Sequence, residues 1–496
     1  MHTLSLILWT PAVAALITAL IPDNQTHWVR GVALTGITGS LVLAWSLAFD
    51  FDTHSFAIQF AETRPWNPEL GSFYALGVDG FSLPMVLLAS LLTLVAVLAS
   101  FSLQERVKGY HVCLLMLESG MFGVFMAQDW VLFYVFWEMT LIPLFFLIDQ
   151  WGGPGRHTAS LNFVLYTMGG SVFMLIALLI IYTSSPDHST AMIVMEKAAR
   201  SLPRDNQVLV FLGLLIGFGV KIPIFPLHGW LPLAHVQAPS PVSILLSGVL
   251  LKMGAYGMLR TASMLPEAML ALQPLLAGLA LTSIVYGGLL AWRQSDLKAM
   301  VAYSSVSHMG VVLLGISTMN QTGLLGATLQ MTAHGLVAAA LFLLIGLLYE
   351  RTHTRQIGDY GSLVLVTPKF AMFTTLALLA AMGMPGTVGF VAELHALLGG
   401  FERWGWWVLG LNLGVLISAA YAVRTIGRLF TGPVSPRMRD IADLKGIELA
   451  AASLLSFGVL ALGLAPSPAL KLIDASVVNL SAAKPHQNSQ EKLLER

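Results

Sequence analysis

The sequence contains only one cysteine, Cys113, among its 496 residues. A single thiol excludes a disulfide framework and a four-cysteine iron–sulfur or zinc site, so any redox centre is expected outside this chain. Neither a GxGxxG turn after a strand nor a GxxxxGKS/T loop is present, so no sequence motif indicates nucleotide binding. Charge is scarce as well, because 10% of the residues are charged and the formal net charge is zero. Nothing therefore suggests nucleic acid or a polybasic lipid-binding tail.

Apolar residues make up 56% of the chain, which predicts a polytopic membrane protein in contact with the lipid bilayer. A spanning helix needs about 20 predominantly apolar residues, and about fourteen runs of that kind are separated by charged or Gly/Pro-rich breaks. The predicted fold class is therefore an all-α membrane protein with about 14 transmembrane helices. The expected spans are 3–21, 29–49, 80–103, 110–127, 129–148, 159–184, 207–226, 239–263, 270–292, 297–317, 324–350, 369–399, 404–430 and 447–466.

Basic residues are distributed unevenly between the alternate loops of these spans, and cytoplasmic loops carry the excess of lysine and arginine. The poorer side holds Arg64, Lys197, Arg200, Arg204, Arg260 and Arg403. Both termini are therefore predicted on the non-cytoplasmic side. The richer side holds Arg30, Arg106, Lys108, Arg156, Arg293, Lys298, Arg351, Arg355, Lys369, Arg428, Arg437, Arg439 and Lys445.

Two lysines, Lys221 and Lys252, lie in the apolar stretch 219–260. A charge at bilayer depth costs roughly 2.5–3.5 kcal/mol even on the mildest scale, so such residues point to an ion pathway. Irregular backbone at that depth survives only against protein or a water-filled cavity. Lys221 is close enough to a helix end for its side chain to reach the interface instead, whereas Lys252 has no nearby interface. The backbone between the lysines is interrupted by Pro223, Pro226, Pro232, Pro239 and Pro241.

Two of the expected spans are broken internally, one at residues 221–223 and one at 384–389. Paired breaks in corresponding halves are typical of inverted-repeat transporters, although Gly/Pro breaks are also common in membrane helices generally. We therefore expect two inverted five-helix repeats, each with a broken helix, at 110–263 and 270–430. Residues 1–109 would add three N-terminal helices, and 431–496 the last helix and a short tail.

Ionisable side chains recur inside the spans and resemble a proton relay, because buried glutamate, lysine and histidine can all exchange protons near neutrality. Glu138 lies in a long apolar run, so Lys221 is the expected partner for its charge. The other candidates are Glu118, His228, His235, His308, His334 and Glu393.

Each of these residues also has a structural interpretation. The histidines could simply hydrogen-bond a neighbouring helix, and Glu118 could be a helix–helix contact. His308 and His334 could also ligate a haem between consecutive helices. Asp129 and Asp296 stand at expected helix starts, where a carboxylate acts as a cap.

The chain resembles the antiporter-like subunits of respiratory complex I, specifically the NuoM/NdhD type, over nearly its whole length. Six segments carry the resemblance in order: FWEMTLIPLFFLI, VKIPIFPLHGWLP, APSPVSILLSGVLLKMGAYGMLR, AYSSVSHMG, MTAHGL and GMPGTVGFVAE. The resemblance implies a Glu138–Lys221 pair at the input, Lys252 as central carrier, His308 and His334 along the axis, and Glu393 in the exit half. The L and N types carry a lysine where this chain has Glu393, which favours the M/D type.

The same resemblance implies a subunit of a proton-translocating NAD(P)H- or ferredoxin-type quinone oxidoreductase, in a bacterial inner membrane or a cyanobacterial thylakoid. Quinone and iron–sulfur clusters would belong to partner subunits, which would include further antiporter-like subunits, and this chain would hold no cofactor or metal. One departure is Leu233, where many relatives have aspartate. The departure puts an inlet role for a carboxylate there in doubt, and it is consistent with the NdhD forms devoted to carbon dioxide uptake.

Two other classes of function remain open from the sequence. A cation/proton antiporter of the Mrp kind shares the fold and the Glu–Lys–Lys pattern, but an ion gradient would drive it. A passive scaffold would leave the buried ionisable groups unexplained.

Overall fold

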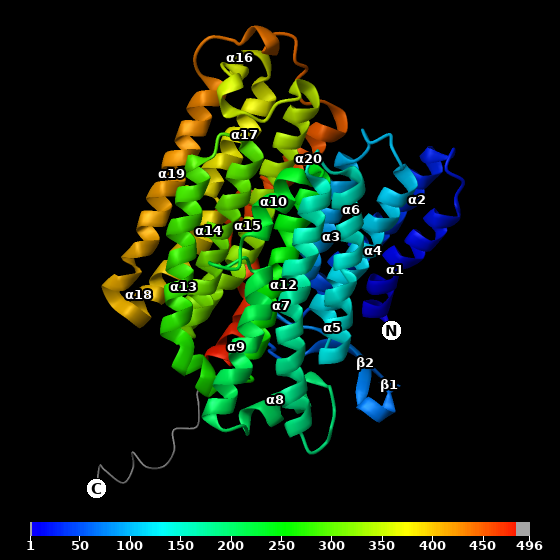
Figure 1. The fold of residues 1–496 in the computed structure, drawn as a ribbon, viewed down its shortest axis with the longest axis vertical. Coiled ribbons are helices and arrows are strands. Elements are labelled where there is room, and N and C mark those ends of the chain that lie inside the picture. The colour runs from blue at the N-terminus through cyan, green and yellow to red at the C-terminus, as the bar shows by residue number, and fades with distance from the viewer. Residues whose placement is uncertain (1, 483–496) are drawn as a thin grey trace.

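Long helices make up almost the whole of the computed structural model, which describes residues 2–482 (Figure 1). Eleven segments are long and apolar enough to cross a membrane, and two further apolar helices, Leu83–Ala99 and Pro368–Ala381, are shorter. Every expected span coincides with at least one helix, while the count of fourteen stays a prediction. The N-terminal and central helices are α1 (Thr3–Leu20), α2 (Thr26–Asp50), α3 (Leu83–Ala99), α4 (Val107–Met126), α5 (Trp130–Met139), α6 (Leu141–Trp151), α7 (Arg156–Ser184), α8 (Met192–Arg200), α9 (Arg204–Lys221), α10 (Trp230–Gln237), α11 (Ser240–Leu245) and α12 (Leu251–Ala262).

The second half of the chain continues the bundle with long helices and a few short connecting turns. The most buried of all the candidate spans are α14, α15 and the stretch Ser240–Ala262, which form the centre of the bundle. The helices of this half are α13 (Pro266–Arg293), α14 (Leu297–Thr318), α15 (Gln321–Thr352), α16 (Leu363–Val366), α17 (Pro368–Ala381), α18 (Val388–Trp404), α19 (Leu409–Phe430), α20 (Gly446–Leu464) and α21 (Ser467–Ala482), with 3-10 turns at Ile357–Asp359, Gly405–Val408 and Pro436–Met438. A further 3-10 turn, Pro68–Leu70, lies in the first half.

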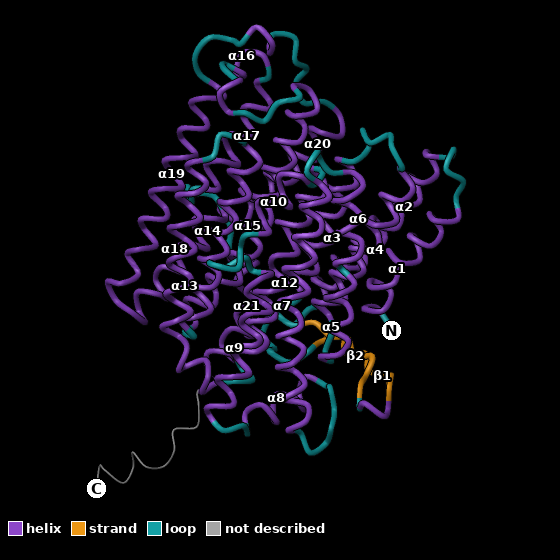
Figure 2. The backbone as a smooth tube through the Cα atoms, viewed as in Figure 1, coloured by secondary structure: helices purple, strands orange, loops and turns teal. Residues whose placement is uncertain are grey.

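A two-stranded antiparallel hairpin, β1 (Gln59–Asn67) and β2 (Ser72–Val78), corrects the all-α prediction (Figure 2). The hairpin and the residues that directly follow it contact both ends of the described chain. The backbone N–H of Leu4 donates to Glu62 Oε1 at 2.8 Å, and the N–H of Gly80 donates to Ser476 Oγ in α21 at 3.0 Å. The start of α1 and the helix α21, which the sequence did not predict, therefore lie at the hairpin end of the bundle.

The first expected break is present, and neighbouring side chains satisfy the backbone that it exposes. Helix α9 ends at Lys221, and the chain turns through Pro223 and Pro226 before α10 begins. In lipid, every freed backbone group must find a partner inside the protein. Trp230 Nε1 donates to the Val220 carbonyl at 2.8 Å, and the N–H of Phe225 donates to Ser283 Oγ at 2.9 Å. Specific hydrogen bonds therefore stabilise the helix interruption within the bundle.

The second expected break separates α17 from α18. Gly383 and Gly386 adopt φ values of 74° and 92°, which side chains rarely tolerate, so the sequence GMPG can turn where a helix would otherwise continue. The carbonyl of Ala381, at the end of α17, has no helical partner and accepts a hydrogen bond of 2.8 Å from His308 Nε2. A candidate relay histidine therefore closes this break.

Two expected spans are less regular than predicted. The span 129–148 divides at Thr140 into α5 and α6, where Pro143 cannot donate a backbone hydrogen bond in the first turn of α6. The span 239–263 contains a π-helical turn at Leu246–Leu250. A π-helical turn occurs mostly as a single turn inside an α-helix and is frequent at functional sites. This one immediately precedes Lys252.

Candidate functional site

Lys252 lies in the first turn of α12 and is fully buried. Its Nζ donates to the carbonyl of Ser247, in the π-helical turn, and shares a hydrogen bond of 2.7 Å with His334 Nδ1 on α15. A protonated lysine donates in this bond, whereas a neutral lysine can accept from the imidazole. The pair can therefore hold one proton on either side chain.

His334 and His308 continue the chain of titratable groups away from Lys252. Their ring centroids are 5.3 Å apart, and the planes are tilted by 36°. His334 uses Nδ1 for Lys252 and His308 uses Nε2 for the Ala381 carbonyl. Within the described residues, the other nitrogen of each ring has no hydrogen-bond partner. These two free nitrogens are the groups through which a proton could cross between the rings.

Glu393 ends this chain on α18. Its Oε1 lies 3.7 Å from His308 Nε2, within ion-pair distance if the histidine is protonated. A small pocket beside the carboxylate is lined by Ser307, His308, Glu393 and Ser418 among mostly apolar residues. The structure therefore brings together four of the six predicted site residues, Lys252, His334, His308 and Glu393, which we call the central relay.

Lys221 lies apart from the central relay, at the last residue of α9. It is 1% exposed, and its Nζ has no hydrogen-bond partner among residues 2–482. The ammonium group instead lies 5.1 Å from the ring centroid of Trp137 and 5.8 Å from that of Phe163. Aromatic faces attract a cation at such distances, so they stabilise the lysine without neutralising it.

Glu138 does not form the expected direct ion pair with Lys221. No salt bridge joins the two in the described part of the chain, and Glu138 Oε1 is buried without a partner. Adjacent helical residues point about 100° apart, because a turn takes 3.6 residues. The Lys221 ammonium group lies over the ring of Trp137, the residue before Glu138 on α5. The structure therefore shows no direct ion pair between the described side chains, and the functional pairing of Glu138 with Lys221 stays a prediction.

The remaining candidates have surroundings of their own. Glu118 Oε1 accepts a hydrogen bond of 3.0 Å from Ser40 Oγ on α2, which supports the interpretation as a helix–helix contact. His228 packs against Phe225 and Tyr286 after the first break. The Leu233 side chain is 48% exposed, so this departure from the family lies on the surface.

The two predicted helix caps are confirmed. Asp129 Oδ1 accepts from the backbone N–H groups of Val131 and Leu132 at 2.9 and 3.1 Å. Asp296 Oδ1 accepts from those of Lys298 and Ala299 at 2.8 and 3.0 Å.

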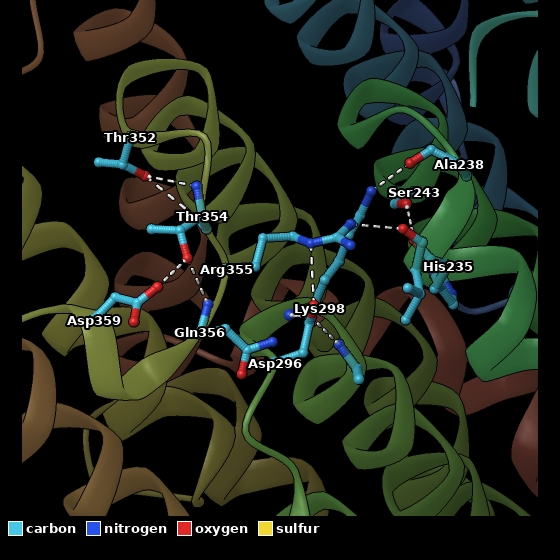
Figure 3. A network of polar contacts seen from close by, with 12 residues as sticks. His235, Ala238, Ser243, Asp296, Lys298, Thr352, Thr354, Arg355, Gln356 and Asp359 are labelled. Carbon is cyan, nitrogen blue, oxygen red and sulfur yellow. Dashed lines mark hydrogen bonds and ion pairs between the residues drawn. The ribbon is translucent and has the colours of Figure 1, made fainter. Parts of the chain in front are cut away.

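Lys298 (Figure 3) is a buried ionisable residue that the sequence reasoning did not include among the candidates. It was counted with the cytoplasmic loops, but it is 4% exposed in the first turn of α14. The sequence contained a signal, because a cap at Asp296 places Lys298 inside the helix rather than before it.

No group of three or more His, Cys, Asp or Glu side chains in residues 2–482 is arranged to hold a metal ion. The two histidines proposed for haem are both hydrogen-bonded to the protein, to Lys252 and to the Ala381 carbonyl. These bonds explain their positions without a haem.

Comparisons with known proteins agree with the architecture. A family profile described as NADH:quinone oxidoreductase/Mrp antiporter, TM, matches residues 127–418. NAD(P)H-quinone oxidoreductase chain 4 1 of Synechococcus sp. (strain JA-2-3B'a(2-13)) is 40% identical over 492 residues, covering 97% of this chain and 92% of the relative.

Solved structures give the same result for the fold. A chain of respiratory complex I from Thermus thermophilus is 32% identical, with a TM-score of 0.86, and the match covers 97% of this chain and 100% of that one. A chain of the Mrp complex from Dietzia sp. is 22% identical, with a TM-score of 0.82, covering 100% of this chain and 56% of that one, and shares the fold alone. The resemblance to complex I antiporter-like subunits is thus confirmed, and this chain belongs to the NADH:quinone oxidoreductase/Mrp antiporter transmembrane family.

Proposed function

We propose that this chain is a proton-translocating membrane subunit of a complex I-type quinone oxidoreductase. The observation that carries the proposal is the central relay, in which Lys252, His334, His308 and Glu393 succeed one another through the buried centre of the bundle. Intramembrane ionisable residues are costly and mark ion paths and proton relays. Four of them in contact or near contact are difficult to explain as packing.

In this scheme, Lys252 and His334 hold the proton at the centre and Glu393 receives it last. The proton leaves Lys252 Nζ for His334 Nδ1, and His334 releases a proton from Nε2 towards His308 Nδ1. His308 then releases a proton from Nε2 to a Glu393 oxygen. Each imidazole takes a proton on one nitrogen and gives one from the other, so the ring orientations match the direction of transfer.

In this proposal, Glu138 and Lys221 control when the proton is transferred. An opposite charge within about 4–6 Å favours a protonated lysine and burial opposes it, so the state of the pair controls whether Lys221 keeps its proton. The arrangement with Lys221 against Trp137 and Phe163 corresponds to the separated state of that cycle. Return of Glu138 to Lys221 would reset it.

The chain acts as a subunit of an oxidoreductase without a redox site of its own. Quinone and iron–sulfur clusters belong to partner subunits, and their electron transfer drives the cycle. The relatives in Synechococcus and Thermus thermophilus, named as an oxidoreductase chain and a complex I chain, support this assignment. Further antiporter-like membrane subunits are the expected neighbours, in an inner membrane or a thylakoid.

The proposed topology has about fourteen helices with inverted repeats at 110–263 and 270–430, flanked by 1–109 and 431–496. The support is the pair of helix breaks after α9 and after α17. The hairpin, the start of α1 and α21 lie together at one end, which we assign to the non-cytoplasmic side. Because Leu233 is exposed and outside the central relay, it gives no support to a carbon dioxide-uptake branch.

An Mrp-type antiporter is the alternative, since the Dietzia chain shares the fold. Purification in mild detergent separates the two. We expect the chain to copurify with a quinone-reducing complex, and its removal to lower the number of protons taken up per quinone reduced. Sodium-dependent transport by an assembly without redox centres would contradict the proposal and establish the alternative.

A further inference from the structure

A cavity of about 170 Å³ lies between α5, α7 and α8, at the end of the bundle that holds the hairpin. Figure 1 shows α8 beyond the ends of α7 and α9, at that end. The cavity reaches from Leu179 on α7, which is 50% exposed on the outer face of the bundle, to Met195 on α8, which is 1% exposed. Its lining is mostly apolar, so it is a hydrocarbon-lined space that opens on the outer face.

Hydrogen bonds fix the floor of this cavity. Asp129 Oδ2 accepts from Thr190 Oγ1 at 2.6 Å and from the backbone N–H of Phe73 in β2 at 3.1 Å. The Thr190 carbonyl accepts from the N–H of Trp130 at 2.9 Å, and the Thr190 N–H donates to the Gly71 carbonyl at 3.1 Å. These bonds hold the loop before α8, the hairpin and the start of α5 together beneath the cavity.

A cavity with this lining is expected to hold hydrocarbon rather than water. A buried water needs roughly two to four polar partners, whereas an apolar cavity of roughly 150 Å³ stays dry and binds benzene. An unfilled cavity also forfeits the van der Waals contacts of its lining. Because the mouth lies on the outer face of a membrane bundle, the acyl chains of the bilayer are the hydrocarbon that surrounds it.

The polar groups of the lining are those expected at the boundary between acyl chains and headgroups. Trp130, Tyr134 and Tyr182 line the cavity, and tryptophan and tyrosine are enriched at that boundary. Trp130 is 1% exposed, and its Nε1 has no hydrogen-bond partner among residues 2–482. A buried indole N–H usually donates to a partner. The ester carbonyl of a phospholipid is an acceptor of this kind at the same depth.

Helix α8 provides a place for the headgroup. Met195 lines the cavity, while Ile193 is exposed, and Lys197 is exposed without an ion pair in the described part of the chain. Apolar and basic residues on one short helix are typical of helices that lie in the plane of the membrane interface. Arg200 at the end of α8 is already paired with Glu196 at 2.7 Å. An anionic headgroup would therefore complement the charge of Lys197.

We propose that this cavity binds one acyl chain of an anionic phospholipid, with the headgroup over α8 and the chain against Tyr134. Tyr134 precedes Glu138 by four residues on α5, so their side chains are neighbours on one face of the helix. Glu138 is also a charged group that acts electrostatically on Tyr134. The bound chain therefore forms part of the surroundings of Glu138. Its effect on proton transfer rests on the proposed function, whereas the binding site does not.

A photoreactive lipid identifies the occupant. The assembled complex is placed in phosphatidylcholine vesicles that contain phosphatidylglycerol with a diazirine in one acyl chain, and the labelled residues are identified by mass spectrometry. We expect adducts on Leu178 and Met195, which line the cavity but are buried and therefore out of reach of the surrounding bilayer. Most of this labelling should be lost when the diazirine is carried by phosphatidylcholine instead, because its headgroup has no net charge.

Two variants fill the cavity from different walls. Leu179→Trp enlarges a side chain of α7 and Val131→Phe enlarges one of α5, so both should lose most of the adducts on Met195. The matched control is Ile176→Trp, because Ile176 on α7 is 51% exposed but lies outside the lining, and it should keep the adducts. Lys197→Gln should keep a labelled Met195 but lose the preference for phosphatidylglycerol.

Absence of adducts on Leu178 and Met195 in the unmodified complex would overturn the proposal and indicate that a neighbouring subunit fills the cavity. Undiminished labelling of Leu179→Trp and Val131→Phe would overturn it as well, and if Leu179→Trp fails to assemble, the Val131→Phe result decides. Equal labelling by the two lipids would overturn the anionic headgroup.

Proton uptake per quinone reduced is measured on the same samples. We expect the cavity-filling variants to lose part of it, because the surroundings of Glu138 change. Loss of the adducts with normal uptake would overturn the link to Glu138 and leave the binding site and the proposed function intact. Failure of the proposed function is recognised separately, by normal uptake in Lys252→Ala.

Discussion

Replacing Lys252 with alanine is expected to stop proton translocation through this chain while the complex still assembles. The variant removes the side chain that joins the π-helical turn to His334, and with it the hydrogen-bond partner of His334 Nδ1 among residues 2–482. We expect transfer to fall by roughly 10²-fold or more, the size typical of losing a positioned proton-transfer group. Proton uptake into sealed vesicles measures the loss, and a native gel measures assembly separately.

Lys252→Arg is the matched control for charge. It keeps a cation beside His334 but cannot release its proton, so it should fail as alanine does. Normal uptake by assembled Lys252→Ala complexes would remove the central carrier from the scheme. Normal uptake by Lys252→Arg alone would mean that the position needs a charge and no exchangeable proton.

Glu393→Gln should also lose most of the transfer through this chain, with a fall of roughly 10²-fold or more for removal of a proton acceptor. Glutamine keeps the volume beside His308, 3.7 Å away, but it cannot titrate. Glu393→Lys restores an exchangeable proton of the kind that the L and N types carry, so we expect it to retain part of the activity. Uptake and quinone reduction are measured together for both variants and the unmodified complex.

Glu402→Gln on the same helix controls for general effects on α18, because Glu402 is exposed and accepts a hydrogen bond from Thr322. It should pump normally. If glutamine and lysine at position 393 pump equally well, titration there is irrelevant. Glu393 would then be a structural residue packed against Gly383 at the second break, where its Oε2 lies 2.5 Å from the place that a Cβ on Gly383 would occupy.

Local chemistry made several features predictable from the sequence. Proline removes a backbone donor from a helix, so the prolines after Lys221 predict the first helix break. The glycines of GMPG predict the second break, before α18, in the same way. Asp129 and Asp296 were readable as caps because their side chains satisfy N–H groups two and three residues away.

Contacts between residues far apart in the chain could not be predicted from the sequence in this way. The Lys252–His334 bond joins residues that are 82 positions apart, and no local period encodes it. The same limit applies to Glu138 and Lys221, whose pairing stays a prediction, because the side of α5 that faces α9 depends on how the helices pack. Lys298 was misplaced because charge alone suggested a loop, while the cap beside it placed the lysine inside the bundle.

The most direct test of the central relay is a double-variant cycle on Lys252 and His334, with proton uptake per quinone reduced as the measured quantity. Residues that act as one unit are strongly non-additive. If the two side chains pass the same proton, Lys252→Ala, His334→Ala and the double variant should show the same loss. If the two losses multiply in the double variant, or if either single variant pumps normally, the protons do not pass through this pair and the account is contradicted.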